Sequence, residues 1–140
     1  MTTPSVRRVV FASALYDLLV TVLFATPWTA RALLTALAGL HTALQLPGLT
    51  PAPPDALALM FANLMGSLVV VWSVVRLRAP SAQLGLADVA GRALFAAWQL
   101  HALLQGVSWV LVPILLGELV WGLAQLAVVA PALWPTRVRT

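Results

Sequence analysis

Apolar residues gather into four long stretches, separated by short polar or proline-rich segments. These stretches cover about residues 9–26, 56–75, 82–104 and 108–130. A helix needs about 20 apolar residues to cross the hydrocarbon core of a bilayer, and each stretch is close to this length. The pattern therefore predicts an all-α membrane protein with four transmembrane helices, forming a single domain over residues 1–140.

The segment 28–46, between the first and second stretches, has a different pattern. Its polar residues Arg31, Thr35 and Thr42 fall near one face of a helix, and leucines fill the opposite face. This spacing predicts an amphipathic helix at the membrane interface rather than a further span. The pattern leaves open whether the helix lies flat on the membrane or covers the end of the bundle.

The composition agrees with a membrane protein. Of the 140 residues, 61% are hydrophobic and only 9% are charged. A soluble domain carries about 25% charged residues because its surface must face water. A soluble enzyme and a free nucleic-acid-binding protein are therefore excluded, and the lipid bilayer is the expected environment.

The positions of the arginines predict the topology. All eight cations are arginines, and six of them flank the apolar stretches: Arg7, Arg8, Arg76, Arg78, Arg137 and Arg139. With four spans these six fall on one side, so the positive-inside rule places both termini in the cytoplasm. The lysine-free, arginine-rich usage indicates a GC-rich bacterial genome, so the expected location is the bacterial inner membrane. Asp17 interrupts the first apolar stretch, which favours an uncleaved span over a signal peptide.

Similar short motifs recur in the two halves of the chain. Asp17 and Asp88 stand in similar surroundings about 71 residues apart, and Gly66 and Gly117 do so about 51 residues apart. The difference is close to the length of the amphipathic helix. We therefore expect two hairpins related as a parallel repeat, with the two aspartates at similar depth and the two glycines at close helix contacts. Coincidence is the alternative, because apolar sequences resemble each other easily.

Three of the four acids, Asp17, Asp88 and Glu118, fall inside predicted spans. Each costs at least about 2.5 kcal/mol at the bilayer centre, so each is expected to face a partner or a cavity. Helical spacing aligns other polar residues with them: Ser13 and Thr21 in the first span, Asn63 and Ser67 in the second, Arg92 and Gln99 in the third, and Gln125 in the fourth. We expect these stripes to converge on a polar core.

The polar core is the candidate site. Asp17 and Glu118 are the candidate catalytic pair, and the candidate ligand-binding residues are Tyr16, Asn63, Asp88, Arg92, Trp98, Gln99 and Trp121. Three acids against the one intramembrane arginine, Arg92, predict that at least one carboxyl group is protonated at neutral pH and able to act as an acid or proton carrier. The alternative is an ion network that only fixes helix register. Cysteine is absent, no metal site is expected, and no cofactor is indicated.

Four spans in about 140 residues, with an insertion after the first, resemble the small DoxX-like membrane proteins. The plan is also similar to that of the EXPERA group, which includes sterol isomerases and sigma-2-type ligand binders. The EXPERA resemblance implies buried acids near an aromatic pocket. In this chain the acids would be Asp17 and Glu118, and the aromatic residues would be Trp98 and Trp121. It implies a pocket for an isoprenoid, quinone or lipid. The DoxX resemblance implies an accessory subunit of a quinone-linked membrane complex.

Three functions follow from these observations. The leading hypothesis is a protein that binds a hydrophobic small molecule in a polar-lined intramembrane cavity, with acid/base isomerase chemistry as its sharper form. The second is a proton-coupled transporter, which at four spans would need to form a homodimer. The third is a structural or assembly subunit with a partner in a membrane complex. A closed cavity favours the first, a path to both faces the second, and a solid core the third.

Overall fold

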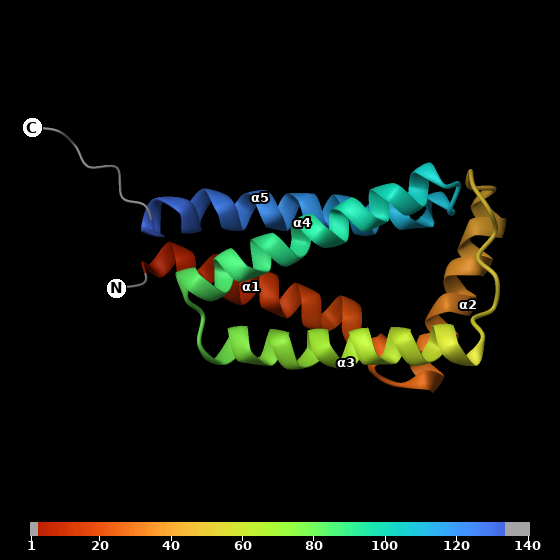
Figure 1. The fold of residues 1–140 in the computed structure, drawn as a ribbon, viewed down its shortest axis with the longest axis horizontal. Coiled ribbons are helices and arrows are strands. Elements are labelled where there is room, and N and C mark those ends of the chain that lie inside the picture. Colours follow the sequence, from red (N-terminus) through yellow and green to blue (C-terminus); the bar gives the residue numbers. More distant parts are fainter. Residues whose placement is uncertain (1–2, 134–140) are drawn as a thin grey trace, which may run out of the picture.

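The computed structural model describes residues 3–133, and every regular element in this range is helical (Figure 1). The α-helices are α1 (Pro4–Thr21), α2 (Pro27–Leu44), α3 (Ala56–Arg78), α4 (Ala82–Leu104) and α5 (Val112–Leu133), with 3₁₀ turns η1 (Val22–Ala25) and η2 (Trp109–Leu111). The all-α class is thus confirmed for the described part of the chain. Trp134, Arg137 and Arg139 lie outside the described residues.

Side-chain caps explain where several helices begin. The Thr3 and Thr26 hydroxyls cap α1 and α2, each followed by a proline in the first turn, where its missing N–H costs nothing. Asp55 Oδ1 accepts the Ala58 N–H at 2.7 Å at the start of α3. Ser81 caps α4 in the same way.

The long helices form two antiparallel pairs. α1 packs on α3 and α4 packs on α5, while α1 also contacts α5 (Figure 1). α1 begins and α5 ends at the same end of the bundle, here named the terminal end. From there α3 and α4, joined through residues 79–81, diverge and do not pack against each other along their lengths.

The opposite end, here named the capped end, is covered by α2 (Figure 1). The His41 ring of α2 is buried with Nδ1 2.7 Å from Ser108 Oγ. In the following segment the Leu49 N–H donates to the Gly106 carbonyl at 2.8 Å, and the Trp109 N–H donates to the Pro47 carbonyl at 3.0 Å. The amphipathic helix predicted at 28–46 therefore exists as an 18-residue helix and lies across the bundle end.

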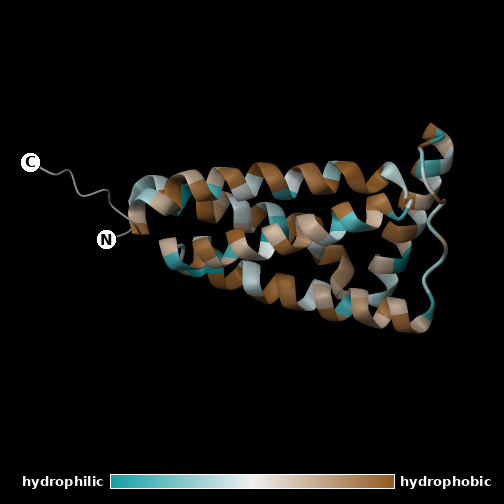
Figure 2. Ribbon diagram, turned by 45° about the horizontal axis from the view of Figure 1, so that its top comes forward, coloured by the Kyte–Doolittle hydropathy of each residue, from teal (hydrophilic) through white to brown (hydrophobic). Residues whose placement is uncertain are grey.

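Three segments are long and apolar enough to cross a membrane: Pro4–Ala25, Ala56–Arg78 and Trp109–Leu133. Apolar residues dominate these helices, and hydrophilic residues gather in the connection at the capped end (Figure 2). Large apolar side chains face outward; Leu68 is 69% and Leu123 67% exposed. These features are compatible with a membrane protein. α4 has the same 23-residue length as α3 but carries Asp88 and Arg92, and it is not among the three.

The first apolar stretch differs from its expected bounds of 9–26. Its α-helix begins at Pro4 and ends at Thr21, and the chain continues as the tighter turn η1. The turn brings Phe24 against α3, where a Cβ on Gly66 would come within 2.6 Å of the Phe24 Cβ. Gly66 therefore permits the close contact, as expected for this glycine.

Candidate functional site

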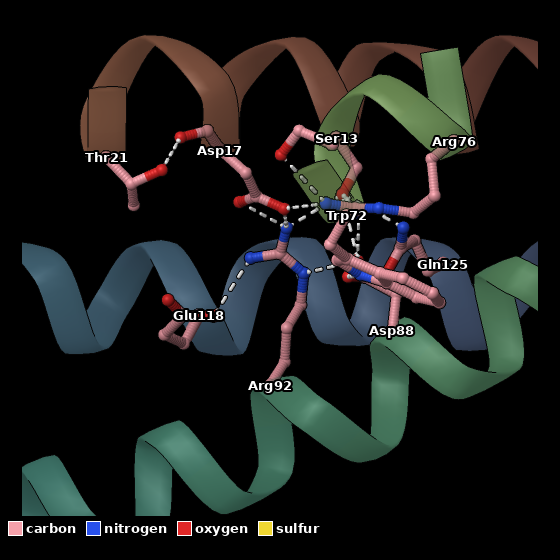
Figure 3. Close-up of polar contacts among 10 residues, drawn as sticks. Ser13, Asp17, Thr21, Trp72, Arg76, Asp88, Arg92, Glu118 and Gln125 are labelled. Carbon is pink, nitrogen blue, oxygen red and sulfur yellow. Dashed lines mark hydrogen bonds and ion pairs between the residues drawn. The ribbon is translucent and has the colours of Figure 1, made fainter. Parts of the chain in front are cut away.

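Five charged side chains meet in the middle of the bundle, in an arrangement here named the ion cluster. It consists of Asp17 of α1, Arg76 of α3, Asp88 and Arg92 of α4, and Glu118 of α5. All four long helices contribute, and Figure 3 shows the side chains pointing toward one another. The predicted convergence of the acidic residues is therefore found in the structure.

Arg92 joins all three acids (Figure 3). Its Nε lies 3.0 Å from Asp88 Oδ2, one nitrogen of the guanidinium fork lies 2.9 Å from Glu118 Oε2, and the other lies 2.6 Å from Asp17 Oδ1. A planar guanidinium has donors in several fixed directions, which suits it to binding several carboxylates at once. Arg92 is 4% exposed, so these contacts replace its hydration.

Arg76 is the second cation of the ion cluster. It is fully buried, with separate nitrogens 2.6 Å from Asp17 Oδ2 and 2.6 Å from Asp88 Oδ2, and its guanidinium lies 5.5 Å from the Trp72 ring centre. Arg76 was predicted to flank the second span with the other arginines, but its side chain lies inside the bundle. Helical side chains tilt toward the helix N-terminus. In the last turn of α3 this direction leads back into the bundle.

Ser13 connects the charged groups through its buried hydroxyl. The hydroxyl accepts hydrogen bonds from Arg92 at 2.8 Å and from Gln125 Nε2 at 2.9 Å, and it donates to Asp88 Oδ2 at 3.3 Å. The other oxygen of Asp88 accepts the Trp72 indole N–H at 2.9 Å. Neutral donors and acceptors thus add hydrogen bonds to the buried charges, although Arg76 Nε has no partner among residues 3–133.

The ion cluster holds three carboxylates and two guanidinium groups, so it carries one surplus negative charge when all are ionised. Both oxygens of Asp17 and both of Asp88 have partners. Glu118 binds Arg92 through Oε2, and among residues 3–133 its Oε1 has no hydrogen-bond partner. The surplus charge is therefore best assigned to Glu118.

A partly enclosed cavity of about 260 Å³ adjoins the ion cluster, where α3 and α4 diverge. Its polar wall includes Asp17, Asp88, Arg92 and Glu118. Its remaining wall is mainly apolar, formed by Leu68, Val69, Trp72, Ala87, Gly91 and Phe95, with Thr21 at its edge. Apolar walls with a few placed polar groups are typical of small-molecule sites.

The other predicted ligand-binding residues lie away from this cavity. Tyr16 and Trp121 pack together between α1 and α5, with ring centres 5.7 Å apart. The Asn63 amide donates to the Phe24 carbonyl at 2.8 Å and so holds η1 against α3. Trp98 is 68% exposed. Gln99 is half-buried, and its Oε1 has no partner within the described range.

Four further residues, which were not among the predicted candidates, belong to the site: Ser13, Thr21, Trp72 and Arg76. Ser13 and Thr21 share the polar stripe of Asp17, so helical spacing was a usable signal for both. Trp72 is one turn before Arg76 on α3, and the two side chains contact each other. Because the predicted span ended at residue 75, no signal in the sequence indicated that the Arg76 side chain lies inside the bundle.

Comparison with protein-family models, with curated proteins and with solved structures finds no match to this chain.

Proposed function

We propose that this chain is a bacterial inner-membrane protein that binds a hydrophobic small molecule in the cavity beside the ion cluster. One observation carries the proposal. The cavity combines an apolar wall with a charged one, and it lies where α3 and α4 separate. A packed structural bundle has no need of such a space.

The proposal includes a membrane crossing by α4. This helix packs antiparallel to α5 over comparable length (Figure 1). Its charged residues Asp88 and Arg92 are at most 5% exposed, so they face protein rather than lipid. Internal ion pairing removes much of the cost of charges in a span. Four crossings then place Arg7, Arg8 and Arg78 together at the terminal end, which the positive-inside rule assigns to the cytoplasm.

The topology is tested with single cysteines, because the chain has none of its own. Thr50→Cys and Gln105→Cys lie at the capped end, and Ser5→Cys and Ala79→Cys lie at the terminal end. We expect an impermeant maleimide to label the first two in spheroplasts and the last two only after lysis. Opposite labelling of positions 50 and 105 would contradict the crossing of α4.

The hydrogen-bonding atoms of the cavity wall that have no protein partner indicate which head group the ligand carries. Each guanidinium nitrogen of Arg92 already contacts a carboxylate, whereas Glu118 Oε1 has no partner among residues 3–133. The ionised form of Glu118 therefore offers the cavity a hydrogen-bond acceptor. Of isoprenoid, quinone and lipid ligands, those with a hydroxyl or another donor group fit best, such as an isoprenoid alcohol or a quinol.

Glu118 is also the better placed of the two candidate catalytic acids. Asp17 contacts both arginines, and these contacts occupy both of its carboxylate oxygens. Glu118 has one arginine contact and faces the cavity, so it is the group able to exchange a proton with a ligand. Isomerase-type proton transfer, if present, is assigned to Glu118, with Asp17 holding Arg92 in position. Proton-coupled transport would use the same carboxyl group.

A structural role is the second candidate, because four of the five ion pairs join different helices and together connect all four long helices. Native mass spectrometry of protein purified in mild detergent separates the two. We expect a co-purifying small molecule in the wild type that is lost in Glu118→Gln and retained in Asp55→Asn, a matched carboxylate-to-amide control outside the cluster. A wild type that never carries a ligand, but co-purifies with a stoichiometric protein partner, would favour the structural role.

The resemblance in plan to DoxX-like and EXPERA-type proteins belongs to the same proposal. It adds the prediction that the ligand is an isoprenoid, a quinone or a lipid. Identification of the co-purifying molecule by its mass tests this prediction directly.

A further inference from the structure

A second hollow, of about 400 Å³, lies between the start of α2 and the first turns of α3, apart from the ion cluster. Pro27 and Arg31 of α2 line it from one side. On α3, its lining residues Ala56, Met60 and Ser67 fall on one helix face. The hollow is therefore a groove that runs along α3 for about 16 Å, given a rise of 1.5 Å per residue.

The shape of this groove is fixed by contacts beneath it. The Asn63 amide donates to the Phe24 carbonyl at 2.8 Å, and the Thr29 hydroxyl donates to the Leu23 carbonyl at 2.6 Å. Gly66 permits the close approach of Phe24. These contacts hold η1 and the first turn of α2 against α3, so the groove is built into the fold.

Arg31 supplies the only charged side chain of the groove lining. It is exposed, and within residues 3–133 no carboxylate lies within ion-pair distance of it. The neighbouring Trp28 is 78% exposed. Exposed tryptophan and arginine at a helix end are typical of the bilayer interface, where a guanidinium group meets lipid phosphates.

We propose that this groove binds a phospholipid, with the phosphate paired to Arg31 and one acyl chain lying along the face of α3. The groove has a cationic group at the bundle end and an apolar floor beneath it, formed by Leu59, Met60 and Leu64. This order of charge and apolar surface matches an amphiphile with an anionic head. The site is independent of the cavity beside the ion cluster and of the ligand proposed there.

The test adds phosphatidylglycerol to the purified full-length protein in mild detergent and measures retained lipid by native mass spectrometry. Loss of one charge-assisted contact corresponds to about a tenfold weaker association for Arg31→Gln, with partial retention in Arg31→Lys. Arg78→Gln is the matched control, because Arg78 is an exposed arginine at the terminal end. The control should retain lipid like the wild type.

Further binding measurements identify the source of the phosphate group and test whether the groove holds the acyl chain. Inorganic phosphate should not displace the lipid, and diacylglycerol should bind weakly and equally to wild type and Arg31→Gln. Ser67→Phe, which fills the inner end of the groove, should lower retention of long-chain phosphatidylglycerol. Equal retention in wild type and Arg31→Gln, or equal loss in Arg78→Gln, would overturn the proposal. Circular dichroism confirms that each variant is folded.

Discussion

Asp17 and Asp88, from α1 and α4, bind the same two arginines. Each carboxylate lies 2.6 Å from Arg76, and Arg92 reaches Asp17 at 2.6 Å and Asp88 at 3.0 Å. The two guanidinium groups therefore stand between the two aspartates, and three of these four bridges join different helices, while Arg92–Asp88 lies within α4. The stability of the bundle depends on these contacts, because a buried charge that loses its partner retains the cost of its desolvation.

Removal of Arg76 should therefore destabilise the protein strongly. Arg76→Met leaves Asp17 and Asp88 with one cation instead of two in a buried site, and breaking a buried pair costs about 3–5 kcal/mol. Thermal unfolding in detergent measures the loss. Arg78→Met, two residues further on and exposed, serves as control and should unfold near the wild-type temperature. Equal behaviour of the two variants would contradict the assignment of Arg76 to the ion cluster.

The two candidate catalytic acids should respond differently to neutralisation. Asp17→Asn weakens contacts to two arginines, whereas Glu118→Gln weakens a contact to one and removes the surplus charge. We expect the free energy of unfolding to fall clearly more for Asp17→Asn, by about 1–3 kcal/mol for weakened charged hydrogen bonds. Denaturant titration of both variants checks this order. A larger loss for Glu118→Gln would refute the charge assignment.

Gly117 should tolerate no side chain while Tyr16 is present. A Cβ at Gly117 would overlap the Tyr16 hydroxyl, so Gly117→Ala should cost about 1–3 kcal/mol of stability. Tyr16→Phe removes the hydroxyl and should restore much of the loss in the double variant. Gly91→Ala is the control, because no atom lies within 4 Å of a Cβ there. An additive double variant would show that the hydroxyl is not the obstacle.

The attachment of α2 can be tested by a cross-link. Leu49 and Val107 form an isolated parallel bridge, and the His41 ring contacts Ser108 beside it. Leu49→Cys with Val107→Cys should form a disulfide on mild oxidation, since the chain contains no other cysteine. Leu44→Cys with Val107→Cys provides a control for unspecific oxidation. His41→Ala should slow the cross-linking by loosening α2, and unchanged kinetics would argue against the buried contact.

Helical periodicity and the cost of buried charge were sufficient to predict that Asp17, Asp88, Arg92 and Glu118 meet. Both principles act along one helix and need no knowledge of its neighbours. They failed for Arg76, because a position near a helix end does not reveal whether a long side chain points to water or back into the bundle. The direction depends on what the neighbouring helices offer, here Asp17 and Asp88.

The remaining differences also come from contacts between helices. Asn63 shares a helix face with Ser67, but its amide donates to the Phe24 carbonyl. This carbonyl is available because α1 ends at Thr21 and the chain continues as the 3₁₀ turn η1. Trp98 is next to Gln99 of the polar stripe of α4, yet its side chain faces outward.

The expected internal repeat stays a prediction. Gly66 and Gly117 both lie at close contacts, but their neighbours, Phe24 and Tyr16, are not equivalent in the two halves.

The divergence of α3 from α4 has a consequence for how a ligand arrives. In the proposed orientation the gap faces the plane of the membrane, so a molecule reaches the cavity by lateral diffusion without passing through water. Its local concentration is then set by partitioning, which favours the bilayer by about 0.8 kcal/mol for each methylene group. Apparent affinity would rise about fourfold per added methylene with no new contact to the protein, and it would fall when excess lipid dilutes the ligand.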